Sequence, residues 1–126
     1  MAKLVQVRVD RSRALVGSAI QRADSPWLRM RGLLGRAGLD AGTGMRFEPA
    51  SSLHMWFMRF PIDVIYVDRD ERVVKLVSEL KPWRVSAARG AKIAYEVPAG
   101  TIAETDITVG DQLTLEAATQ PTEVAA

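Results

Sequence analysis

Cysteine is absent from the 126 residues, and histidine occurs once, as His54. Without a thiol the chain forms no disulfide, no thiolate-bound zinc or iron–sulfur centre, and no cysteine nucleophile. A single imidazole also excludes a metal centre built from several histidines. No spacing of carboxylates indicates a metal site, so we expect neither a metal nor another cofactor.

Long apolar runs are missing as well. A signal peptide needs an unbroken apolar stretch of roughly 7–15 residues, and a membrane-spanning helix needs roughly 20. The segment MAKLVQVRVDR at residues 1–11 instead alternates apolar and polar side chains and carries charges throughout. The sequence therefore predicts a cytoplasmic protein without a membrane span.

The charge is almost balanced but unevenly distributed. The formal net charge is +2, yet residues 1–36 carry eight basic side chains against Asp10 and Asp24, a net of +6, and residues 37–126 carry nine against thirteen acidic ones, a net of −4. An anion-binding face in the N-terminal part would have this pattern, and so would a plain solvated surface. Because the net charge is small and no known reader motif is present, we expect no nucleic-acid partner.

The length and the apolar pattern fit one domain. We assign residues 1–116 to a single globular domain. Residues 117–126 have no apolar period and are predicted to be a disordered tail.

Short alternating or wholly apolar stretches predict six or seven strands, at residues 3–9, 14–20, 53–58, 62–67, 72–80, 92–97 and 112–116. The stretch 62–67 is apolar on both faces, as in a central strand, and a polar turn joins it to 72–80 as a hairpin. The predicted core members are Val64, Ile65, Tyr66, Met55, Phe57, Val74, Leu76 and Leu113.

Helix signals are few. Ser25-Pro26 is a typical helix start, and a second short helical turn is predicted at residues 101–106. The fold class is therefore mainly β (α+β): a small, mostly antiparallel barrel or sandwich with one or two short helices. A cis peptide bond is predicted at Phe60-Pro61, where an aromatic residue precedes proline at a bend.

Three sequence blocks carry a family resemblance: RMRGLLGR at 29–36, the segment 54–74 with KPWR at 81–84, and YEVPAG at 95–100 with VGDQL at 109–113. In this order and spacing the chain resembles the bacterial and archaeal family known as domain of unknown function 192, over about residues 13–115. The resemblance implies a small β-barrel-like fold and no particular reaction, because none is established for the family. Many relatives carry a signal peptide, from which this chain departs.

Six residues in these blocks are candidates for ligand binding: Arg31, Arg36, His54, Arg59, Asp63 and Trp83. Arginine side chains match phosphate and carboxylate groups, and an indole in a polar loop suits a contact surface. His54 can transfer a proton near neutral pH, but no nucleophile or second base stands at a suitable spacing. Asp63 begins an apolar strand and needs donors, for which an arginine at 31, 36 or 59 is predicted.

These observations favour a non-enzymatic module that binds a small anionic or sugar-like ligand, or a protein partner. One alternative is a small hydrolase that uses Asp63 or Glu96 together with His54. Another, suggested only by the secreted relatives, is an accessory protein of a cell-envelope assembly. The sequence leaves open whether the protein is an enzyme, and whether the arginine and aspartate cluster is structural or functional.

Overall fold

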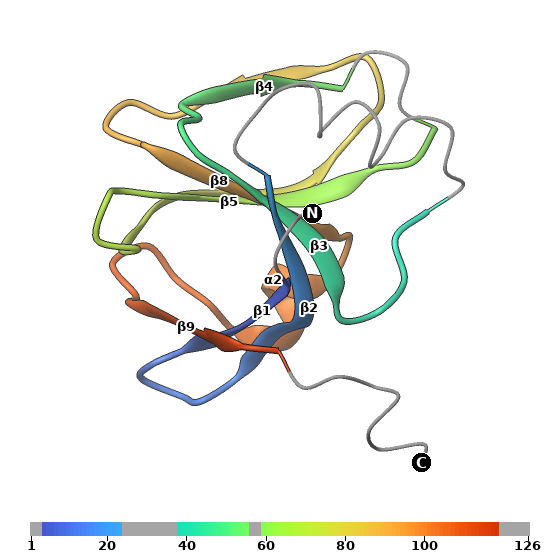
Figure 1. Cartoon of the computed structure of the whole chain (residues 1–126). Coiled ribbons are helices and arrows are strands. Elements are labelled where there is room, and N and C mark those ends of the chain that lie inside the picture. The colour runs from blue at the N-terminus through green and yellow to red at the C-terminus, as the bar shows by residue number, and fades with distance from the viewer. Residues whose placement is uncertain (1–3, 24–37, 56–58, 119–126) are drawn as a thin grey trace.

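A computed structural model describes residues 4–23, 38–55 and 59–118, and within them the fold is mainly β (Figure 1). The nine strands in these residues are β1 (Leu4–Val9), β2 (Leu15–Ala23), β3 (Thr43–Phe47), β4 (Ser52–His54), β5 (Ile62–Val67), β6 (Val73–Leu80), β7 (Val85–Ala87), β8 (Ile93–Pro98) and β9 (Leu113–Ala117). One short helix, α2 (Thr101–Thr105), follows β8.

Seven of the strands form one sheet, in the order β6-β5-β8-β3-β2-β1-β9, and β4 and β7 form a separate two-stranded sheet. The neighbours in the large sheet pair antiparallel, except that β2 and β3 run parallel. The mostly antiparallel arrangement predicted from the sequence is confirmed.

The large sheet curls until its two edge strands meet at one end. Arg72, just before β6, forms an isolated bridge with Gln112, just before β9. Two further backbone hydrogen bonds reinforce this closure, from the Val73 amide to the Asp111 carbonyl at 2.8 Å and from the Leu113 amide to the Glu71 carbonyl at 3.0 Å. The result is a half-barrel, with β5 and β8 between the β4 side and the strands β1, β2 and β9 (Figure 1).

Strand β5 is buried along its whole length because apolar side chains pack against both of its faces. Ile62, Val64 and Tyr66 belong to one core cluster, which also contains Met55. The alternate residue Ile65 belongs to the other cluster, with residues of β1 and β9. The prediction of a central strand at 62–67 is confirmed.

The predicted core is also confirmed where the structure describes it. Of the eight residues, Phe57 lies outside the described ranges, none of the other seven is widely exposed, and the buried ones are Met55, Val64, Ile65, Tyr66 and Leu113. Val74 and Leu76 are half-buried and pack against the two clusters. Alternating and wholly apolar stretches were therefore sufficient to predict these core residues.

Several predicted elements differ in extent. Strands β3 and β7 were not predicted, and β9 includes residue 117, where the tail was expected to begin. The predicted helix starting at Ser25-Pro26 and most of the tail lie outside the described residues. Among those residues the cis peptide bond is at Glu48-Pro49 and not at Phe60-Pro61, so that prediction was wrong. A preceding aromatic residue is a weak bias against the intrinsic trans preference of an X-Pro bond.

Asp111 ties the β1–β2 turn to the segment before β9. Its carboxylate accepts two parallel hydrogen bonds from Arg11, each 3.0 Å long, and one of 2.9 Å from the Thr108 amide. The hydrogen bonds from Arg11 lower the pKa of Asp111 from its ordinary value to about 2, against the opposing effect of burial, and the Thr108 amide contributes in the same direction. The carboxylate is therefore held in its ionised form.

Replacing Asp111 with asparagine should lower the free energy of unfolding and make that free energy less dependent on pH. Because the folded-state pKa lies below the unfolded value of about 3.9, the stabilisation is complete above pH 4 and is lost as the pH falls toward 2. Arg11 is 53% exposed, so solvent screening limits the loss at pH 7 to roughly 1–2 kcal/mol. Urea unfolding at several pH values measures this loss of unfolding free energy. The exposed Asp70→Asn is the control, and equal pH slopes for both variants would contradict the assignment.

Candidate ligand-binding site

The structure places the six sequence-predicted residues in different surroundings. Arg31 and Arg36 lie outside the described residues, as does the side chain of His54, whose backbone pairs with Val85 between β4 and β7. Arg59 is exposed before β5, whereas Asp63 is buried inside it. No common site made of these six residues emerges from the described part of the chain.

Asp63 is held by backbone amides. One oxygen accepts from the Glu79 amide at 2.8 Å, and the other accepts from the amides of Gly100 and Ile102 at 3.1 and 2.8 Å. The donors that we predicted to come from an arginine are thus supplied by the end of β6 and the start of α2. Arg59 forms no ion pair with Asp63 within the described ranges, and the pairings with Arg31 and Arg36 lie outside them. Three close amides satisfy a buried carboxylate without a counter-ion.

Trp83 is exposed, as its polar loop predicted, with 60% of its surface accessible. It stands between β6 and β7 in the left-handed backbone region, with φ of 68°. Its amide donates to the Met55 carbonyl at 2.8 Å, and the Met55 amide donates to the Arg84 carbonyl at 2.7 Å. These two bonds fix the turn against buried Met55 and present the indole on its outer side.

A pocket with a volume of about 580 Å³ lies between two loops that sequence reasoning did not single out. Its walls are residues 49–52, which follow β3 and end with the first residue of β4, and residues 88–92, between β7 and β8. The lining contains the hydroxyl residues Ser51 and Ser52, the basic residues Arg89 and Lys92, and otherwise only glycine, alanine and proline. This loop pocket, as we call it, has the volume typical of small-molecule sites.

Backbone hydrogen bonds hold the two walls of the loop pocket together. The Ala50 amide donates to the Lys92 carbonyl at 2.8 Å, and the Ala88 amide donates to the Ser51 carbonyl at 2.9 Å. The turn at 88–91 needs a left-handed residue, which is Gly90 with φ of 86°. The pocket is therefore formed by the paired backbone and not only by mobile side chains.

The electrostatics of the loop pocket favour a negatively charged ligand. Arg89 and Lys92 are both exposed, and no carboxylate is part of the lining. The nearest acidic residue in the sequence, Glu48, forms an ion pair of 3.1 Å with Arg46. The two cations of the pocket are thus not neutralised by a carboxylate in its wall.

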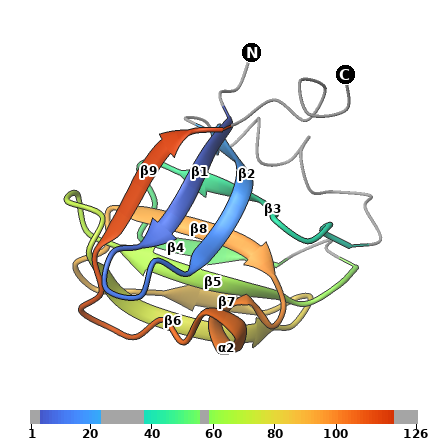
Figure 2. The same ribbon diagram turned by 90° about the horizontal axis from the view of Figure 1, so that it is seen from below.

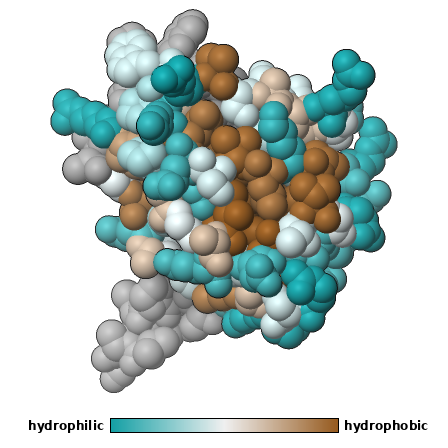
Figure 3. All heavy atoms as spheres, turned by 180° about the vertical axis from the view of Figure 1, so that it is seen from behind, coloured by the Kyte–Doolittle hydropathy of each residue, from teal (hydrophilic) through white to brown (hydrophobic). Residues whose placement is uncertain are grey.

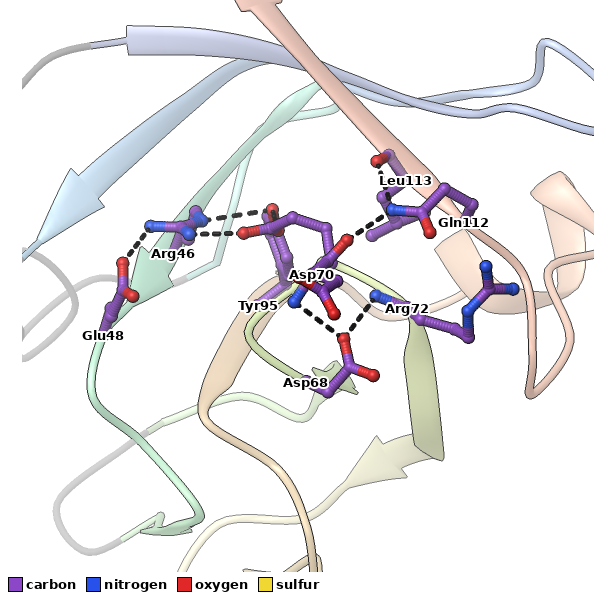
Figure 4. A network of polar contacts seen from close by, with 9 residues as sticks. Arg46, Glu48, Asp68, Asp70, Arg72, Tyr95, Gln112 and Leu113 are labelled. Atoms are coloured by element: carbon purple, nitrogen blue, oxygen red, sulfur yellow. Dashed lines mark hydrogen bonds and ion pairs between the residues drawn. The ribbon is translucent and has the colours of Figure 1, made fainter.

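Arg46 is buried and is the centre of a second cluster of polar side chains, of which Glu48 is exposed (Figure 4). Its Nε donates to the Tyr95 hydroxyl at 3.2 Å, and its guanidinium also pairs with Glu48 and Glu71. The Tyr95 hydroxyl donates in turn to Glu71. Burial raises the pKa of Tyr95, and the neighbouring Glu71 carboxylate raises it further. With every partner satisfied inside the protein, this cluster is structural: it joins β3, β8 and the β5–β6 turn.

The loop pocket could not be recognised as a unit from the sequence. Its two walls are about forty residues apart in the chain, and neither contains a binding motif. The available signal was the segment ARGAK at 88–92, in which glycine separates two basic residues just before a predicted strand. Such a segment is typical of a turn that presents cations, yet it gives no indication of the opposite wall.

Comparison with known proteins extends the resemblance found in the sequence. A family described as "Uncharacterized ACR", domain of unknown function 192, matches residues 6–115. The chain belongs to this family. Membership confirms the relationship predicted from the three sequence blocks, and it assigns no activity because the family is uncharacterised.

Two relatives named UPF0127 are similar to part of the chain. A protein named UPF0127 from Thermococcus sibiricus is 39% identical over 67 residues, 52% of this chain and 43% of that protein. Another from Pyrococcus furiosus is 44% identical over 64 residues, 50% of this chain and 54% of that protein. The chain spans about half the length of the curated relatives that it matches.

Two crystal structures share the fold. One is a protein of unknown function from Novosphingobium aromaticivorans, with a TM-score of 0.75, 24% identity, and coverage of 90% of this chain and 84% of that one. The other, from Sinorhizobium meliloti, is provisionally described as a transcription regulator, with a TM-score of 0.75, 19% identity, and coverage of 91% and 94%. At these identities the likeness establishes the fold alone.

Two further findings concern the described residues only. None of the helices in these ranges is long and apolar enough to cross a bilayer. In the same ranges no three side chains of histidine, aspartate or glutamate are grouped as metal ligands would be.

Proposed function

We propose that the protein is a binding module for a small organic anion, such as a sugar phosphate, and that the loop pocket is its site. The observation that carries the proposal is the composition of the lining: two cations and two hydroxyl residues, with no carboxylate. Arginine and lysine attract anionic groups, and serine hydroxyls hydrogen-bond to sugar hydroxyls or phosphate oxygens. A volume of about 580 Å³ leaves room for a ligand larger than a bare phosphate ion.

The hydrolase alternative receives less support from the geometry. Both oxygens of Asp63 accept hydrogen bonds from buried backbone amides, and the side chain is only 1% exposed. Glu96 is equally buried. A general acid or base must reach the proton that it transfers, and neither carboxylate is accessible to a substrate.

Calorimetric titration with ribose 5-phosphate, inorganic phosphate and ribose tests the proposal. We expect the affinity to fall in that order, because the phosphate pairs with the cations and the sugar adds contacts with the hydroxyls. Arg89→Glu and Lys92→Glu should each weaken ribose 5-phosphate binding by about tenfold or more, and higher salt should weaken it in the wild type.

The matched control is Arg59→Glu. It makes the same charge change at an exposed residue before β5 that is not part of the lining of the loop pocket. It should leave the affinity unchanged. Loss of binding in Arg59→Glu with normal binding in Arg89→Glu would reject the loop pocket and favour a site around the residues first predicted from the sequence. Equal binding of ribose and its phosphate would reject the role of the charges.

The cytoplasmic location and the absence of a nucleic-acid partner stay predictions within this proposal. The small net charge supports the absence of a nucleic-acid partner. Cell fractionation and a nucleic-acid retention assay at physiological salt test them.

A further inference from the structure

A second cavity, unrelated to the loop pocket, lies where α2 approaches the start of β2. Its volume is about 330 Å³, and its lining comes from the start of β2, the loop before β3, and the segment from the end of β8 into α2. The larger apolar residues in its lining are Leu15, Val16, Leu39 and Pro98. Leu15 leaves 40% of its surface exposed, so an apolar ligand would bury surface that now faces water.

The same side of the molecule is apolar on a larger scale. The side that carries α2 is turned away from the viewer in Figure 1 and lies at the lower edge of Figure 2. Figure 3 looks onto that side and shows apolar side chains gathered in one area bordered by polar ones. Areas of this kind on a soluble domain mark places where a ligand or partner binds.

One charged side chain belongs to the cavity, the carboxylate of Glu104. Glu104 is one helical turn after Gly100, and its amide donates to the Gly100 carbonyl at 2.9 Å. Its Oε1 lies only 3.8 Å from where a β-carbon on Gly100 would stand. The carboxylate is therefore folded back over the segment that lines the cavity and does not extend away from it.

The other polar side chains of the cavity are already engaged. The Thr101 hydroxyl donates to the Pro98 carbonyl at 2.7 Å, and the Thr105 hydroxyl donates to the Thr101 carbonyl at 2.8 Å. Both threonines are buried and shape the wall. The lining thus combines apolar side chains with polar groups and one negative charge, whereas the charges of the loop pocket are positive.

From this geometry we infer that the second cavity binds a small organic cation: an amine with a short, branched aliphatic body. The aliphatic part lies against Leu15, Val16, Leu39 and Pro98, and the ammonium group pairs with Glu104. A carboxylate beside apolar side chains favours a cation with an aliphatic body, because it attracts the ammonium group and repels an anion.

Titration followed by amide chemical shifts tests the inference with three probes of one shape: 3-methylbutylamine, 3-methylbutan-1-ol and 3-methylbutanoate. We expect the amine to bind at least about tenfold more tightly than the alcohol, with shifts at residues 15–17 and 99–105, and the carboxylate not to bind. Glu104→Gln should reduce the amine affinity to that of the alcohol. Ala99→Leu, at an exposed lining residue, should narrow the cavity and weaken the binding of both the amine and the alcohol.

Glu79→Gln, the same substitution at an exposed position on β6, is the control and should not change the affinity for the amine. The inference is overturned if no probe binds the wild type, if amine and alcohol bind equally, or if Glu104→Gln keeps the preference for the amine. Phosphate binding in the loop pocket should be unaffected by Glu104→Gln, so the two sites are tested independently.

Discussion

Asp63→Ala should lower the free energy of unfolding by about 3 kcal/mol or more. The substitution leaves three amides, those of Glu79, Gly100 and Ile102, without their acceptor inside the protein, and each unsatisfied buried donor costs about 1–3 kcal/mol. The loss should appear in urea unfolding as a lower midpoint with little change in slope.

Asp63→Asn should also destabilise the protein, by roughly half as much. The amide keeps one carbonyl acceptor, which can serve the Gly100 and Ile102 amides, but its NH₂ group then faces the Glu79 N–H. Had an arginine been the partner, the asparagine would have left that arginine as the unsatisfied group. The ranking of the two variants therefore reports the role of the backbone donors.

Asp68→Ala is the matched control for Asp63. The Asp68 carboxylate also accepts two backbone amides, from Asp70 at 2.9 Å and Arg72 at 3.0 Å, but it does so in a partly exposed turn. Water can replace the lost acceptor there, so the cost should stay below about 1 kcal/mol. If Asp63→Ala and Asp68→Ala lowered the free energy of unfolding equally, burial would not explain the effect at Asp63.

Gly44→Ala should be among the most damaging single substitutions in the chain. A β-carbon at residue 44 would stand 2.5 Å from the Glu96 carbonyl oxygen and 3.1 Å from side-chain atoms of Ile20 and Val97. The nearest obstacle is backbone in the middle of the sheet, so relief requires β3 and β8 to separate. We expect a loss of about 3 kcal/mol or failure to fold, measured by urea unfolding or soluble yield.

Gly38→Ala is its control, because among the residues that the structure describes, apart from its chain neighbours, no atom lies within 4 Å of the position that its β-carbon would occupy. Its stability should stay within about 0.5 kcal/mol of the wild type. A Gly44→Ala protein as stable as Gly38→Ala would show that β3 and β8 do not approach as closely as described.

Local patterns predicted those parts of the fold whose partners are near in sequence. The hairpin of β5 and β6 was predicted because Ile62–Val67 is apolar on both faces and a polar turn follows it. Strand β3 was missed because it holds a glycine and Arg46, and its burial depends on Tyr95 and Glu71 from other parts of the chain. A buried arginine is indistinguishable from a surface one until its partners are known.

The candidate sites were less predictable than the fold for the same reason. The need of Asp63 for donors could be inferred from the apolar strand that it begins. The identity of those donors could not, because backbone amides occur at every position except proline and leave no mark in the sequence. The loop pocket and the second cavity are likewise each assembled from segments distant in the chain.

The pairing of β1 with β9 determines when the half-barrel can be completed during translation. Val5 lies opposite Ala117, and Val9 lies opposite Leu113, so β1 pairs with a strand that is translated about a hundred residues later. Until residues 113–117 emerge, the outer edge of β1 has no strand beside it, and an unpaired edge can recruit another nascent chain. Completion of the half-barrel is therefore delayed until these residues have been translated, and the interval before it is when the newborn polypeptide most needs protection by a chaperone.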